Sequence, residues 1–161
     1  MGIEEVERVK KIFSELHLNP IYMEHEAVLT SQQAAETRGF ELKQGIKAIL
    51  FANGLGDFAL VNVPADKKIN QKKVAEVLGW NKKDIRMATE EEVLEQTGCQ
   101  IGSVPPFGHK NKIKLLLDVG VYDNEESDFN IGLRTQSVKI KTEEMRRVFH
   151  FVDAEEGQFA K

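Results

Sequence analysis

The sequence predicts a single α+β domain, residues 1–161, whose mixed, largely antiparallel sheet is surrounded by helices. Apolar residues recur at helical spacing in some segments and form short strand-like runs in others. The two kinds of segment interleave irregularly, unlike the strict alternation of a doubly wound sheet. At least two pairs of strand-like runs resemble antiparallel hairpins. The length suits one core, and no repeat or linker divides the chain.

The helices are predicted from their apolar spacing and from residues that favour helix ends. The first helix carries one apolar face, made of Val6, Val9, Ile12, Phe13 and Leu16. Later helices are expected to begin at residues that accept hydrogen bonds from the first turn: Thr30 with Gln33, Asn70, Thr89 with Glu92, and Thr142. The helix from Thr30 runs to about Arg38. The glycines expected to end helices are Gly39, Gly79 and Gly98.

The strands are predicted where β-branched, aromatic and leucine residues gather in short runs. The clearest pair lies in GIKAILFANGLGDFALVNV, where two apolar runs flank the turn GLGD. The other predicted strands are Ile21 to His25, Ile85 to Met87, Leu115 to Leu117, Phe129 to Leu133 and Val138 to Ile140. The final segment, EEGQFAK, is expected to be loose.

The segment GSVPPFG, from Gly102 to Gly108, is unusual on physical grounds. Pro105 and Pro106 fix φ and lack an N–H group, whereas the glycines at both ends permit backbone geometries that other residues avoid. Such a loop is rigid and presents backbone groups, which suits the positioning of a carbonyl or of an attacking water. An ordinary tight turn explains the same residues, since Gly and Pro occur in most loops.

Lys47 is the single charge in an otherwise apolar predicted strand. Strand alternation places its side chain on the same face as Ile49 and Phe51. An ammonium group is costly to bury unless it is paired. Lys47 therefore either lies at the end of the sheet, with its ammonium reaching water, or faces a ligand cavity.

The order of these features resembles the YbaK family and the editing domains associated with prolyl-tRNA synthetases. The resemblance rests on Lys47 in its apolar strand, on the Gly-x-x-x-Pro loop from Gly102 to Pro106 with Phe107 and Gly108 after it, and on a strand that ends near Gly132. It extends from about Val6 to Phe149 and includes the segment HEAVLTSQQAAETRG. The fold of that family agrees with the predicted α+β class.

The resemblance implies that the chain hydrolyses the ester between a wrong amino acid and the 3′ end of a tRNA, most often tRNA for proline. The chemistry would be substrate-assisted, with a ribose hydroxyl helping to activate water. The catalytic residues would be Lys47, which contacts the terminal nucleotide or the ester, and Gly102 and Pro106, whose loop positions the carbonyl or the water. The implied substrate-binding residues are Tyr22, Ser103, Val104, Pro105, Phe107, Gly108, Asn130 and Gly132.

Three residues depart from the family pattern, and one of them, Pro105, makes the loop stiffer than usual. Ala48 follows Lys47 where the family often has a hydroxyl residue, and Asn130 stands where relatives often carry a small or hydroxylated one. Asn130 either hydrogen-bonds a substrate or simply ends a strand. These departures leave open a non-catalytic module of the same fold that binds tRNA or a synthetase. A small-molecule binder or hydrolase unrelated to tRNA is a third possibility.

The charge is unevenly distributed. The net charge of −4 argues against a nucleic-acid partner, but seven basic and three acidic residues lie between Asp66 and Arg86, and a second basic run follows the loop. Both runs could follow the phosphates of a tRNA acceptor end. The candidate tRNA-binding residues are Lys67, Lys68, Lys72, Lys73, His109, Lys110 and Lys112. A solvated helix face explains the first run as well.

The expected partners are mischarged aminoacyl-tRNA and, in second place, prolyl-tRNA synthetase. The histidines and Cys99 lack metal-ligand spacing, so neither a metal nor another cofactor is expected. Residues 1–20 lack the apolar core of a signal peptide, and no run reaches transmembrane length, so the expected location is the cytoplasm, without membrane contact. A complete chain would be a freestanding editing factor, and an excised one an appended domain.

Overall fold

The structure of the protein, a computed structural model, describes residues 1–27 and 41–161. Its strands are β1 (Ile21–Glu24), β2 (Ile46–Ala52), β3 (Phe58–Pro64), β4 (Arg86–Met87), β5 (Lys114–Asp118), β6 (Glu126–Leu133), β7 (Gln136–Lys141) and β8 (Glu155–Gly157). Its helices are α1 (Ile3–Glu15), α3 (Gln71–Leu78), α4 (Glu90–Thr97) and α5 (Thr142–Phe151), with the 3-10 helices η1 (Leu42–Gln44) and η2 (Val119–Asp123).

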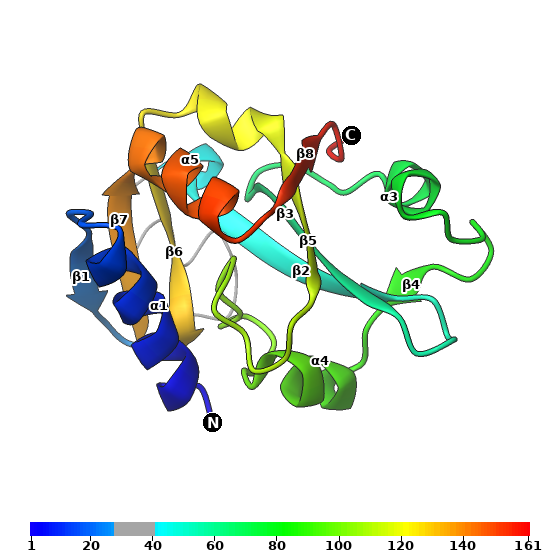
Figure 1. The fold of residues 1–161 in the computed structure, drawn as a ribbon, viewed down its shortest axis with the longest axis horizontal. Coiled ribbons are helices and arrows are strands. Elements are labelled where there is room, and N and C mark those ends of the chain that lie inside the picture. The colour runs from blue at the N-terminus through cyan, green and yellow to red at the C-terminus, as the bar shows by residue number, and fades with distance from the viewer. Residues whose placement is uncertain (28–40) are drawn as a thin grey trace.

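Two sheets form the centre of the molecule (Figure 1). One has three strands in the order β1-β7-β6, and the other has five in the order β4-β2-β3-β5-β8. Most neighbouring strands are antiparallel, whereas β5 pairs in parallel with both β3 and β8. The predicted α+β class with a mixed, largely antiparallel sheet is therefore confirmed.

The predicted ends of two helices are confirmed. The side chain of Asn70 accepts a hydrogen bond from Lys73 N–H at the start of α3 (3.2 Å), and Thr89 accepts one from Glu92 N–H at the start of α4 (3.2 Å). Both helices end at a glycine with left-handed φ, as predicted. The helix predicted from Thr30 to Gly39 lies outside the described residues. None of the helices that the structure describes is long and apolar enough to cross a bilayer.

The prediction that Thr142 caps the last helix is wrong. Lys141 holds the cap position, and α5 begins at Thr142 itself. The Thr142 hydroxyl is hydrogen-bonded to the Ser127 hydroxyl (2.7 Å) inside the protein. Burial against β6 therefore takes the side chain away from the helix end.

Two apolar clusters lie on the two faces of the five-stranded sheet. Residues of β3 alternate between them: Leu60 belongs to the first cluster and Val61 to the second. The first cluster includes residues of α1, α5 and the three-stranded sheet, whereas the second includes Val74 of α3. Figure 1 accordingly shows α1 and α3 at opposite sides of the molecule.

The last residues are not loose, contrary to prediction. Glu155–Gly157 pairs with β5, and Phe159 is only 1% exposed in the second cluster. The carboxylate of Asp118 accepts hydrogen bonds from Phe159 N–H (2.7 Å) and Ala160 N–H (3.0 Å). An aromatic side chain and a buried acceptor from a remote segment therefore fix a tail whose own composition is polar.

Candidate active site

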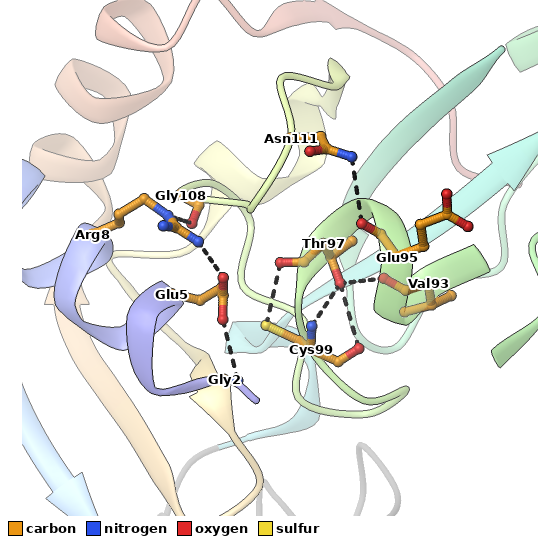
Figure 2. Close-up of polar contacts among 9 residues, drawn as sticks. All are labelled: Gly2, Glu5, Arg8, Val93, Glu95, Thr97, Cys99, Gly108 and Asn111. Carbon is orange, nitrogen blue, oxygen red and sulfur yellow. Dashed lines mark hydrogen bonds and ion pairs between the residues drawn. The ribbon is translucent and has the colours of Figure 1, made fainter. Parts of the chain in front are cut away.

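The candidate site is built around the loop from Gly102 to Gly108, hereafter the site loop, whose base is fixed on α4. After the site loop, Lys110 N–H donates to the Thr97 carbonyl (3.1 Å) and Asn111 N–H to the Gln96 carbonyl (3.0 Å). Before it, Cys99 N–H donates to the Thr97 hydroxyl (3.1 Å), as Figure 2 shows. Carbonyl groups at the end of α4 thus obtain partners, and the chain leaves and returns at one place.

The start of the site loop is held by two side chains from the three-stranded sheet. Asn130 Nδ2 of β6 donates to the Gly102 carbonyl (2.5 Å). Arg134, in the turn between β6 and β7, donates through Nε and Nη2 to the Ile101 carbonyl (3.1 and 2.6 Å). Within the loop, Ser103 is nearly buried, and its hydroxyl donates to the Gln100 carbonyl (2.8 Å). Asn130 therefore does more than end a strand, because its amide fixes the first residue of the site loop.

The second half of the site loop is held in the same way. His109 Nε2 lies 2.6 Å from the Pro105 carbonyl, and Asn62 Nδ2 donates to the Pro106 carbonyl (3.3 Å). Arg8 Nε donates to the Gly108 carbonyl (3.0 Å). Side chains from three separate elements thus bind loop carbonyls, namely Arg8 of α1, Asn62 of β3 and Asn130 of β6, and Arg134 binds the Ile101 carbonyl directly before the loop.

This arrangement occupies the carbonyls of Gly102, Pro105, Pro106 and Gly108 and leaves a backbone N–H available as a donor. Pro105 and Pro106 have no N–H group, and their carbonyls are already bound. Within the described part of the chain, the backbone N–H of the partly buried Val104 has no hydrogen-bond partner. A fixed, unpaired N–H suits a substrate carbonyl whose oxygen gains negative charge.

Lys47 lies at the start of β2, directly opposite Val63 of β3. Because Val63 belongs to the second cluster, the Lys47 side chain follows Ile49 and Phe51 onto that face, as predicted. Ala48 lies opposite Asn62, whose amide reaches Pro106. The Lys47 backbone is thus next to the support of the site loop, but no hydrogen bond or ion pair within the described residues joins its ammonium to that loop.

The electrostatic surroundings of Lys47 connect it to the basic segment. Burial lowers the pKa of the half-buried Lys47 ammonium; the carboxylate of Asp66 opposes this shift, and the positive charge of Lys68 adds to it. The structure therefore brings Lys47 together with a predicted tRNA-binding lysine.

Several other predicted tRNA contacts are exposed. Lys67, Lys68, Lys72, Lys110 and Lys112 are exposed, and Lys73 is partly so. Within the described residues these lysines form no ion pair. Their charges are therefore available to an anionic partner.

His109 does not fit the predicted tRNA role. Its ring nitrogen Nε2 lies against the Pro105 carbonyl, and burial lowers the pKa of the ring to about 4. The ring is therefore neutral near pH 7 and donates its proton inward, since a carbonyl can only accept. His109 supports the site loop instead of contacting a phosphate.

Phe107 and Gly132 also differ from their predicted substrate roles. Phe107 is 0% exposed, and its ring packs edge-on against Phe13 and Phe129, with centroids 5.5 and 6.3 Å away. A Cβ on Gly132 would lie 2.7 Å from the Gly2 carbonyl oxygen, so the space beside this glycine is filled by the chain entering α1. Both residues are packed against other parts of the chain, so neither offers a surface to a substrate.

Tyr22 lies at the outer edge of the three-stranded sheet and is 43% exposed. Its ring contacts Phe13, with centroids 6.4 Å apart, and the Lys10 ammonium lies 4.9 Å from its centroid. Burial raises the pKa of its hydroxyl. Among the described residues, Tyr22 is therefore linked to the site loop through Phe13 and Phe107.

The supporting residues Arg8, Asn62 and Arg134 were missed by the sequence reasoning. Asn62 did carry a signal, because it is a polar residue inside an apolar strand and is fully buried. Nothing in the sequence distinguishes Arg8 and Arg134 from ordinary surface residues, since an arginine on a helix or in a turn is usually solvated.

The fold and this loop define a protein that presents a fixed backbone donor, Val104 N–H, in a loop that is followed by the exposed lysines Lys110 and Lys112. No group of His, Cys, Asp and Glu side chains within the described residues is arranged to hold a metal ion. Such an arrangement is suited to a polyanionic substrate that carries a reactive carbonyl.

Comparison with known proteins identifies the family. Residues 25–148 match the model of the aminoacyl-tRNA editing domain, and the chain belongs to that family. It is 34% identical over 128 residues to the multifunctional Ser/Thr-tRNA deacylase ProXp-y of Escherichia coli K12, covering 77% of this chain and 75% of that protein. It is also 34% identical over 103 residues to a proline–tRNA ligase of Trichlorobacter lovleyi, covering 64% of this chain and 17% of the ligase.

Solved structures agree on the fold. The structure of the hypothetical protein APE2540 superposes with a TM-score of 0.84 at 21% identity, covering 96% of this chain and 99% of that one. A structure described as a candidate trans-editing enzyme for prolyl tRNA synthetase superposes with a TM-score of 0.79 at 24% identity, covering 98% of this chain and 97% of that one. The predicted resemblance to the YbaK family and its editing domains is therefore confirmed.

Proposed function

We propose that this chain is an aminoacyl-tRNA deacylase that hydrolyses the ester of mischarged tRNA and so edits errors in translation. The observation that carries the proposal is the site loop, in which side chains hold the carbonyls of Gly102, Pro106 and Gly108 while Val104 N–H stays unpaired within the described residues. Membership of the aminoacyl-tRNA editing family supports the same reaction.

In this mechanism the loop binds the ester carbonyl. The Val104 N–H donates to the carbonyl oxygen, and its hydrogen bond strengthens as water attacks and negative charge develops. As the water attacks, its proton passes to the neighbouring ribose hydroxyl, which gives its own proton to the ester oxygen that leaves with the ribose, so the products are the free amino acid and a tRNA with an intact 3′ end. The protein contributes mainly orientation and electrostatic stabilisation, so a conventional nucleophile is not required.

Lys47 and the exposed lysines bind the tRNA end. Lys47 contacts a phosphate or the ester of the terminal nucleotide, and Lys68 lies near enough to influence its charge. The proposed surface for the acceptor strand consists of Lys67, Lys68, Lys72, Lys73, Lys110 and Lys112. Because each phosphate contact releases condensed counterions, affinity should fall steeply with salt.

The proposed substrate is tRNA for proline that carries a small wrong amino acid, with prolyl-tRNA synthetase as a second partner. The relatives named Ser/Thr-tRNA deacylase and proline–tRNA ligase support this choice. A synthetase pocket rejects a smaller or isosteric amino acid by only about 1–3 kcal/mol per methylene. A separate editing site supplies the missing discrimination.

The test is single-turnover deacylation of tRNA for proline charged with serine, threonine, alanine or cysteine. Wild type should remove at least one of these esters rapidly, and Lys47→Ala should slow that reaction about a hundredfold at saturating tRNA. The control Lys43→Ala removes a nearby exposed lysine that pairs with Glu41 (3.4 Å) and should change little. Bound tRNA without ester loss above the spontaneous rate would instead favour a non-catalytic tRNA-binding module.

A further inference from the structure

The start of α1 contains a buried carboxylate. Glu5 is 2% exposed although it lies in the first turn of a helix. Its Oε1 accepts a hydrogen bond from Gly2 N–H (3.1 Å), and its Oε2 forms an ion pair with Arg8. A Cβ on Gly98 would collide with this carboxylate, so the end of α4 closes over it. Figure 2 shows Glu5 on the side of α1 that faces Thr97 and Cys99 at the end of α4.

Arg8 connects this buried charge to the site loop. Its Nη2 binds the Glu5 carboxylate, and its Nε donates to the Gly108 carbonyl (3.0 Å), as Figure 2 shows. The planar guanidinium can make both bonds at once without changing shape. Because the carboxylate is buried and held by two donors, it orients the guanidinium toward the loop more firmly than solvent could.

We propose that Arg8, oriented by Glu5, is a positioning residue for the deacylation reaction. Gly108 ends the site loop, and the next residue, His109, holds the Pro105 carbonyl. A shift at Gly108 therefore propagates to His109 and from there to the backbone that carries Val104 N–H. This inference rests on the proposed function, because positioning matters only if that N–H serves a reacting carbonyl.

A purely structural role is the competing explanation. An exposed i,i+3 ion pair on a helix contributes only a few tenths of a kcal/mol. This pair differs because the carboxylate is buried, so loss of its partner alone would destabilise the fold. The test must therefore separate folding from positioning.

The main variant is Arg8→Lys, which keeps the positive charge beside Glu5 but removes the planar fork. The matched control is Arg147→Lys, because Arg147 Nη2 donates to the Leu16 carbonyl (3.0 Å) at the far end of α1. We expect Arg8→Lys to slow single-turnover deacylation about ten- to a hundredfold with unchanged tRNA Kd and melting temperature. Arg147→Lys should stay within about twofold of wild type on the same principle.

Hydrogen exchange of the backbone amides in residues 101–109 gives a readout that needs no activity. Exchange should be faster in Arg8→Lys than in wild type and unchanged in Arg147→Lys. If Arg8→Lys fails to fold, the double variant Glu5→Gln with Arg8→Gln removes both charges together and leaves no uncompensated buried carboxylate. It should fold and show the same slow reaction and faster loop exchange.

Three outcomes would overturn the inference. Wild-type rates and loop exchange in the folded Arg8 variants would show that Arg8 does not position the loop. A slow rate that disappears after correction for the folded fraction would assign Arg8 to stability alone. An inactive wild type would refute the proposed function and with it the role of Arg8 in deacylation. In that case, loop exchange that is unchanged in the folded Arg8 variants would also refute the positioning contact.

Discussion

The site loop and the basic segment from residue 66 to residue 86 differ in how firmly the rest of the protein holds their functional groups. In the site loop, side chains from three elements bind the carbonyls of Gly102, Pro106 and Gly108, and Phe107 is buried in the core. In the basic segment, Lys67, Lys68 and Lys72 are exposed and form no ion pair within the described residues. One region has a fixed geometry, and the other presents exposed charges on the surface.

This difference indicates separate roles for the two regions, one in positioning the reacting carbonyl and the other in binding the phosphates of the tRNA. A reacting carbonyl must be held to within a fraction of an ångström, because small displacements strongly reduce the rate. Phosphates are attracted over a distance set by ionic strength, and that attraction tolerates side-chain motion. Changes in the loop should therefore alter stability and turnover, whereas changes in the basic segment should alter tRNA affinity.

The largest expected effect comes from Phe107→Ala. Removing this fully buried ring from its contacts with Phe13 and Phe129 should lower the free energy of unfolding by about 3–5 kcal/mol. Urea denaturation at pH 7 measures the change. Tyr22→Ala, which removes a half-exposed ring from the same aromatic row, should have a clearly smaller effect. Equal losses in the two variants would contradict the claim that the loop is part of the core.

The next largest effect is the dependence of the free energy of unfolding on pH that His109 contributes. Its folded-state pKa of about 4 lies below the usual 6.5, so the unfolded chain binds a proton between these values and the folded protein does not. The stability present above pH 6.5 is therefore lost as the pH falls toward 4, by an amount of the order of 2 kcal/mol.

His109→Gln should remove this part of the pH dependence while keeping an N–H donor for the Pro105 carbonyl. Urea denaturation of wild type and variant at pH 7.5 and pH 4.5 tests it. The control His17→Asn changes an exposed histidine whose φ of 57° asparagine tolerates, and it should leave the wild-type pH dependence intact. An unchanged pH dependence in His109→Gln would place the ring outside the buried contact with Pro105.

A smaller effect on turnover is expected from Asn130→Ala. Loss of the amide that binds the Gly102 carbonyl should slow single-turnover deacylation about tenfold without changing the tRNA Kd. Lys72→Ala, in the basic segment, should give the reverse result, with weaker tRNA binding and an unchanged rate at saturation. If both variants alter only affinity, the loop is a binding surface and the contrast between the two regions fails.

Much of the fold could be predicted because the signals are local. Asn70 and Thr89 cap helices through residues three positions away, and strand alternation placed Lys47 on the correct face. The docked tail was not predictable, because Phe159 is held by a strand and by Asp118 far away in the sequence. Thr142 was misassigned for a similar reason, since the partner of its hydroxyl, Ser127, lies on β6 and not in α5.

The candidate site was predicted in outline and not in its supports. Glycine and proline identify the site loop because their backbone constraints are visible in the sequence. The side chains that hold its carbonyls come from remote elements, so neither Arg8 nor Arg134 could be assigned to it. His109 was assigned to tRNA because a histidine beside lysines resembles a basic patch, and only burial shows that its ring is neutral.

The smallest effect, and the one that sharpens the comparison most, is expected from Lys68→Ala. Loss of one phosphate contact should make the slope of log affinity against log salt less steep by about 0.7 to 0.9. The rate at saturating tRNA should stay unchanged. Lys11→Ala, which removes an exposed lysine of α1 that pairs with Glu15 (3.9 Å), should not alter the slope.

Lys68→Ala also tests the link between the two regions. Because the charge of Lys68 lowers the pKa of Lys47, its removal should raise that pKa, which NMR titration of the Lys47 side chain would detect. A raised pKa with an unchanged rate would mean that Lys47 acts as a charge that binds the tRNA end and not as a proton donor. A rate that follows the pKa of Lys47 would instead place this residue in the chemical step. In that case β2 would contribute to catalysis as well as to the binding of the tRNA end.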